Sequence, residues 1–127
     1  MSGGMNPVTG LSLGRIAIGV ASLANPSMAA QQMMLDPRSN PQVPYVTRLF
    51  GTREIALGAA TLLATGKARR TLVLLGILVD AADAATGYLA VKDGSAPVKA
   101  GQGMTAVASG AVVAGFLGLR TGKTLTD

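Results

Sequence analysis

The chain has 127 residues, enough for one domain, and only 13% of them are charged, about half of the roughly 25% usual in soluble domains. It has neither cysteine nor histidine, so disulfides, thiol redox chemistry and nearly all zinc or haem sites are excluded, and no cofactor or metal is expected. The net charge of +5 does not indicate a nucleic-acid partner, because the basic residues are scattered and aromatic residues make up 3%. The composition instead predicts one all-α integral membrane domain over residues 1–127.

Four mainly apolar segments follow one another along the chain. They cover residues 8–24, 43–65, 71–91 and 98–119. Each is close to the roughly 20 residues that a helix needs to cross the hydrocarbon core of a bilayer. The sequence therefore predicts a transmembrane four-helix bundle surrounded by lipid.

The longest connection lies between the first two segments. It contains Met28, Met33, Met34 and Leu35 beside two glutamines. Residues 27–35 are expected either to form a short amphipathic helix on the outer membrane surface or to be a plain loop. The next connection, residues 66–70, is short and basic and is expected to separate the second and third spans.

The distribution of Lys and Arg predicts the orientation. The side that holds both termini carries Lys67, Arg69, Arg70, Arg120 and Lys123. The opposite side carries Arg38, Lys92 and Lys99, with Arg48 near its boundary. The positive-inside rule places both termini in the cytoplasm of a multi-pass protein of the cytoplasmic (inner) membrane.

Each predicted span has a stripe of small or polar residues at three- and four-residue spacing, which places the stripe on one helical face. The stripes are Ser12, Arg15, Gly19 and Ser22; Gly51, Glu54, Gly58, Thr61 and Thr65; Gly76, Asp80, Asp83 and Gly87; and Gly103, Ala106, Gly110 and Ala114. Small residues let helices approach closely in lipid. We therefore expect helix packing at Gly19, Gly51, Gly58, Gly76, Gly87, Gly103 and Gly110.

Six ionisable residues fall inside or at the edge of the spans: Arg15, Arg48, Arg53, Glu54, Asp80 and Asp83. Each costs several kcal/mol at the bilayer centre unless it is paired or hydrated. Depths counted from the cytoplasmic ends predict that Arg15 pairs with Asp80 and that Arg53 pairs with Asp83. Glu54 has no evident cation unless Arg15 or Arg48 reaches it.

Two interpretations of this polar network stay open. It either fixes the register of the helices or forms a binding site or path for an ion, a proton or a ligand. No nucleophile or metal-binding motif accompanies the carboxylates, so no catalytic residue is assigned and an enzyme is not expected.

The segment from Arg48 to Gly58, RLFGTREIALG, followed by Asp80-Ala-Ala-Asp83, resembles a family of small four-helix, actinobacterial-type membrane proteins of unknown function. It is more loosely similar to DoxX-like membrane proteins. Gly14-Arg15 and the proline after the first span fit the same pattern. Some DoxX-like proteins are linked to thiol or quinone redox systems, but the absence of cysteine argues against a direct redox role here.

The sequence thus predicts a non-enzymatic membrane protein that serves as an accessory, assembly or scaffolding component. It is expected to self-associate or to join a larger membrane complex through its glycine faces. The alternative is a small transporter or binding protein for a proton, an ion or a lipophilic ligand, using the charged network. A closed, dry network would favour the first function, and a cleft beside Glu54 would favour the second.

Overall fold

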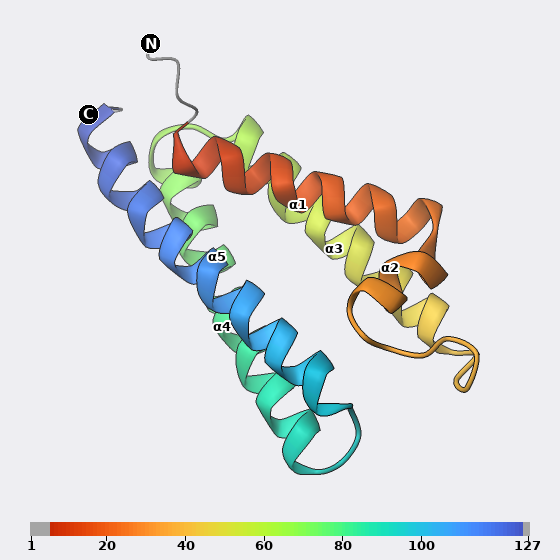
Figure 1. The fold of residues 1–127 in the computed structure, drawn as a ribbon. Helices are drawn as coiled ribbons and strands as arrows, with labels where there is room; N and C mark the ends of the chain where they lie inside the picture. Colours follow the sequence, from red (N-terminus) through yellow and green to blue (C-terminus); the bar gives the residue numbers. More distant parts are fainter. Residues whose placement is uncertain (1–5, 126–127) are drawn as a thin grey trace.

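The computed structural model describes the backbone of residues 6–125 and the side chains of residues 6–119. Over this range the chain contains five helices and no strand: α1 (Pro7–Ala24), α2 (Pro26–Gln32), α3 (Val43–Leu63), α4 (Gly66–Lys92) and α5 (Val98–Leu125) (Figure 1). Three of them, α1, α4 and the Val98–Leu119 part of α5, are long and apolar enough to cross a membrane. By these features the chain is an all-helical, multi-pass membrane protein.

Helix α3 is the predicted span that composition alone does not support. It has 21 residues, a sufficient length, but it carries Arg48, Arg53 and Glu54 and is not among the three apolar helices. The count of four spans therefore stays a prediction. It depends on whether the charges of α3 have partners on the other helices.

The connection between α3 and α4 is shorter than predicted. Helix α4 begins at Gly66, so the expected basic linker is in fact the first turns of this helix, and only Ala64 and Thr65 separate the two helices. Gly66 has a φ of 59°, in the left-handed region that glycine adopts at no steric cost. Such a residue lets the chain reverse direction within two residues, which a search for apolar runs does not detect.

The segment after α1 forms a short helix, which was one of the two predicted alternatives, rather than a plain loop. Asn25 ends α1 and caps α2, because its side-chain oxygen accepts a hydrogen bond from the backbone N–H of Met28. After Gln32 the chain turns, and Met34 takes a φ of 63°. Met28 and Met34 are exposed, whereas Met33 and Leu35 are partly buried. Contact of this segment with the membrane surface stays a prediction.

The helices associate as two pairs, α1 with α3 and α4 with α5. The pairs meet near the two ends of the chain and diverge toward α2 and the α4–α5 turn (Figure 1). A small apolar cluster holds the closed end: Val8 of α1 packs with Val73 and Ile77 of α4, joined by Val112 and Leu119 of α5. The molecule is therefore closed at one end and open at the other.

Glycine brings α1 and α3 into backbone contact. A Cβ atom added at Gly58 would lie 2.6 Å from the backbone oxygen of Ser12, and one at Gly19 would lie 2.6 Å from that of Gly51. Such distances are too short for any side chain. Gly19, Gly51 and Gly58 thus form the close helix contact predicted for them, as small residues do in lipid.

The packing face predicted for α5 is wrong. A Cβ atom at Gly103 or Gly110 would meet nothing within 4 Å. The face that packs contains instead Gly101, against Val91, Gly115, against Ile77, and Gly118, against Val8. Gly101 and Gly103 are each followed seven positions later by a small residue, Ala108 and Gly110, so spacing alone could not identify the packed face.

Candidate functional site

Arg15 of α1 is the centre of a buried polar network that joins three helices. Its Nη1 donates hydrogen bonds to Glu54 Oε2 of α3 at 2.9 Å and to Asp80 Oδ1 of α4 at 3.0 Å. Its Nη2 donates to Asp80 Oδ2 and, at 3.4 Å, to the backbone oxygen of Gly76. The side chains of Arg15, Glu54 and Asp80 are 9%, 6% and 5% exposed. These charges are therefore almost wholly removed from solvent and depend on one another.

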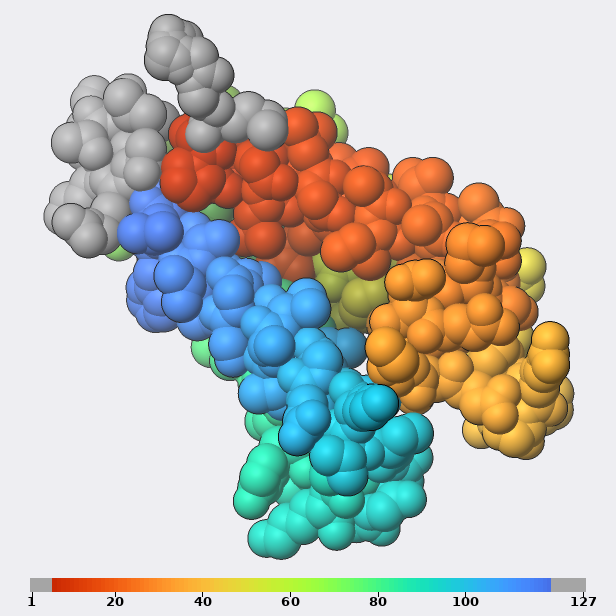
Figure 2. Space-filling model, in the orientation of Figure 1, coloured from red at the N-terminus to blue at the C-terminus, as the bar shows by residue number. Residues whose placement is uncertain are grey.

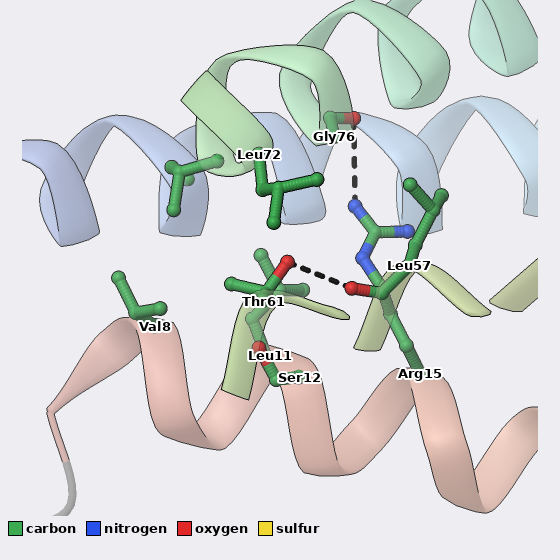
Figure 3. A pocket seen from close by; sticks show the side chains of 10 residues that line it. Val8, Leu11, Ser12, Arg15, Leu57, Thr61, Leu72 and Gly76 are labelled. Carbon is green, nitrogen blue, oxygen red and sulfur yellow. Dashed lines mark hydrogen bonds between the residues drawn. The ribbon is translucent and has the colours of Figure 1, made fainter. Parts of the chain in front are cut away.

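Gly76 makes this arrangement possible. A Cβ atom there would lie 3.1 Å from Nη2 of Arg15, closer than most real contacts. Figure 3 shows the guanidinium group extending from α1 to the Gly76 carbonyl. The glycine predicted as a helix-packing residue thus accommodates a side chain rather than a neighbouring backbone.

A second ion pair lies beside the first. Arg53 Nη2 of α3 donates to Asp83 Oδ2 of α4 at 2.8 Å and lies 3.8 Å from Glu54 Oε1. The Arg53 guanidinium also lies over the Phe50 ring, 5.2 Å from its centroid. Arg53 is 41% exposed and Asp83 is 19% exposed, so this pair is less shielded than the Arg15 pairs.

Both predicted ion pairs, Arg15–Asp80 and Arg53–Asp83, are confirmed. Glu54, for which the sequence left the partner open, pairs with Arg15. Arg48 is exposed and pairs with none of the acidic side chains that the structure describes. Sequence reasoning missed Phe50, although its place three residues before Arg53 puts both on one helical face.

The network has more acid than base. Glu54, Asp80 and Asp83 bring carboxylate oxygens within 4.8 Å of one another, and two guanidinium groups face them, so the formal charges, three negative and two positive, sum to −1. Both oxygens of Asp80 and one each of Glu54 and Asp83 accept bonds from arginine. The carboxylates are thus organised mainly as partners of arginine, with a negative charge in excess.

A large cleft opens beside this network, between the two diverging helix pairs. Its volume is about 960 Å³, and Arg15, Glu54, Asp80 and Asp83 form part of its lining. Most of the rest is small or apolar: Gly10, Gly14 and Ile18 of α1, Met33 and Met34 after α2, and Gly103, Val107 and Gly110 of α5. Figure 2 shows the hollow between α1–α2 and α5, with α3 behind it.

A much smaller cavity lies at the closed end, among the residues that the structure describes. It has a volume of about 10 Å³ and lies between Ser12, Thr61, Leu72 and neighbouring residues (Figure 3). That is room for about one water molecule. The Thr61 hydroxyl donates to the Leu57 carbonyl at 2.7 Å and so needs no other acceptor. Of these two spaces, only the large cleft has room for a ligand larger than water.

Two carboxyl groups in the connecting segments are separate from the site. The backbone N–H of Arg38 donates to Asp36, and the hydroxyl and N–H of Ser95 donate to Asp93. These bonds favour the charged form and lower the pKa of both exposed carboxyls.

Compared with protein-family models, curated proteins and solved structures, the chain matches none. The resemblance to small four-helix and DoxX-like membrane proteins therefore stays a prediction.

Proposed function

We propose that this protein is a small, non-enzymatic membrane protein that binds or carries a lipophilic molecule in the cleft between its two helix pairs. One observation carries the proposal: a cleft of about 960 Å³ has mostly apolar walls and an ion network, with Glu54, in its lining. Ligand sites are typically apolar cavities of several hundred Å³ with few polar groups. A polar network that only fixed the register of the helices would not require a cleft of this size.

We further propose that α3 crosses the membrane, giving four spans. Two of its three charges have partners on apolar helices, since Glu54 pairs with Arg15 of α1 and Arg53 with Asp83 of α4. Backbone contacts at Gly51 and Gly58 hold α3 against α1. Pairing lowers the cost of placing these charges in lipid, so composition alone underestimates the suitability of α3 as a span.

Cysteine labelling tests the four-span topology with both termini in the cytoplasm. In intact cells, cysteine at Ser39 or Ser95 should react with an impermeant thiol reagent, and cysteine at Lys67 should react only after lysis. If α3 did not cross, Ser39 and Lys67 would label alike. Reversed labelling would overturn the orientation. Arg120 and Lys123, on which the orientation partly depends, lie outside the side chains that the structure describes.

Filling the cleft tests the binding function. The substitution Gly110→Trp places a large side chain in open space inside the cleft. It should reduce binding of the neutral lipophilic dye N-phenyl-1-naphthylamine to the purified protein at least several-fold. The control Ser109→Trp, at the neighbouring exposed position outside the lining, should bind as the wild type does. Equal dye binding by all three proteins would contradict the proposal.

The second candidate function is an accessory or scaffolding component of a larger membrane assembly. It is supported by the same open face, because Gly103 and Gly110 could receive a helix of another subunit. Purification in mild detergent would favour it if a stoichiometric protein partner were lost on Gly110→Trp and kept on Ser109→Trp.

A further inference from the structure

We infer that the molecule bound in the cleft is an amphipathic cation, a hydrocarbon chain with a protonated amine as its head. The inference rests on the proposed binding function and adds the chemical class of the ligand. It follows from the formal charge of the network, from the hydrogen bonds that already occupy its arginines, and from the cleft beside it.

The charge excess favours a cation. Among the described side chains, Glu54, Asp80 and Asp83 form ion pairs with Arg15 and Arg53 alone, and an unbalanced charge is costly in a low-dielectric region. Of the three carboxylates, Asp83 is the most exposed, and it lines the cleft. A single positive head group beside it brings the sum to zero.

The arginines are poorly placed to bind an anion instead. Nη1 and Nη2 of Arg15 are both committed, to Glu54, to Asp80 and to the Gly76 carbonyl. Arg53 is held by Asp83. An anionic head group would have to displace a carboxylate while adding to the negative excess, which like-charge repulsion opposes.

One basic residue on the lining stands apart from the network. Lys99 is exposed near the start of α5 and forms part of the lining of the cleft. It makes no ion pair with the described carboxylates of the network. Water screens its charge far more than it screens the buried carboxylates.

A scintillation proximity assay on the detergent-purified protein tests the inference. The probe is radiolabelled dodecylamine at pH 7, and the unlabelled competitors, equal in chain length, are dodecylamine, dodecanol and dodecanoate. We expect dodecylamine to compete at least tenfold better than dodecanol, because a charge-assisted hydrogen bond contributes about 1.5–3 kcal/mol and about 1.4 kcal/mol is tenfold. Dodecanoate should be the weakest competitor.

Variants separate the head-group claim from the cleft itself. Asp83→Asn should weaken dodecylamine binding about tenfold, by the same conversion, and leave competition by dodecanol unchanged. Asp83→Glu should restore the affinity. Gly110→Trp should abolish binding of the whole series, and Ser109→Trp should not.

The outcomes distinguish the two proposals. Equal competition by dodecanol, or stronger competition by dodecanoate, would overturn the cationic head group and leave the cleft as a binding site. Unchanged binding in Gly110→Trp would overturn the cleft itself. If Asp83→Asn does not fold, the competition series on the wild type still decides the head-group claim.

Discussion

The α1–α3 contact and the α5 wall of the cleft contain glycines in similar patterns but use them in opposite ways. At Gly58 there is no room for a single added carbon, because the backbone of α1 lies against it. At Gly110 the same added carbon would meet open space. In the first region glycine permits helix packing, and in the second it leaves volume for something else. Glycine content in a membrane helix therefore does not by itself identify an interface.

The largest expected effect comes from removing Arg15, whose ion pairs join α1 to α3 and to α4. Arg15→Met should lower the free energy of unfolding by about 3–5 kcal/mol, because it leaves Glu54 and Asp80 buried without their partner. Thermal unfolding in mild detergent measures this. The control is Arg48→Met, at an exposed position that forms no ion pair with the described side chains, and it should change stability by about 0.5 kcal/mol or less. Equal stability of the two variants would show that Arg15 does not join the pairs.

Alanine substitutions test the difference between the packed glycine, Gly58, and the open one, Gly110. Gly58→Ala should destabilise by about 1–3 kcal/mol, since its Cβ meets the Ser12 carbonyl oxygen. Gly110→Ala should stabilise by up to about 1 kcal/mol, because alanine favours the helix and nothing obstructs it. Unfolding midpoints that move in the same direction would mean that the two regions do not differ as described.

A smaller effect is expected at the half-exposed ion pair. Arg53→Ala and Asp83→Ala should each destabilise by about 1 kcal/mol, less than Arg15→Met, because Arg53 reaches solvent. The double variant should lose less than the sum of the singles, since the second change no longer leaves a charge without its partner. Strict additivity in the double-mutant cycle would refute the pairing.

The smallest change in stability is expected at Met34, because glycine adopts its backbone conformation more readily than methionine does. Met34 has a φ of 63° and forms part of the lining of the cleft. Met34→Gly should therefore stabilise by about 1 kcal/mol. Met28→Gly, within α2, should instead destabilise by up to about 1 kcal/mol. A loss of stability in Met34→Gly would indicate that its side chain contributes packing in the wall of the cleft.

Much of the site could be predicted because charged residues within a membrane span are restricted in where they can lie and in what they can pair with. A charge inside a span must find a partner, and a rise of about 1.5 Å per residue gives its depth, which was enough to pair Arg15 with Asp80 and Arg53 with Asp83. The stripes of α1, α3 and α4 are buried largely as predicted, with Ser12, Gly58 and Gly76 among them.

The α5 face and the cleft could not be predicted in the same way. Gly101 and Gly103 are two residues apart, about 200° around the helix, and each is followed by a small residue seven positions later, Ala108 and Gly110. Nothing in the sequence of α5 distinguishes the packed face from the open one. The cleft depends on the angle between the two helix pairs, which arises from contacts distant in sequence, such as that of Val8 with Gly118.

The position of Arg15 in the first helix also has a consequence for biosynthesis. Its partners Glu54 and Asp80 follow 39 and 65 residues later, so α1 leaves the ribosome before either is available. An unpaired arginine near the middle of a span costs about 2.5–3.5 kcal/mol on insertion. The nascent α1 should therefore stay beside the translocon until α3 emerges, and chains truncated before Glu54 should integrate less efficiently than the same chains with Arg15→Leu.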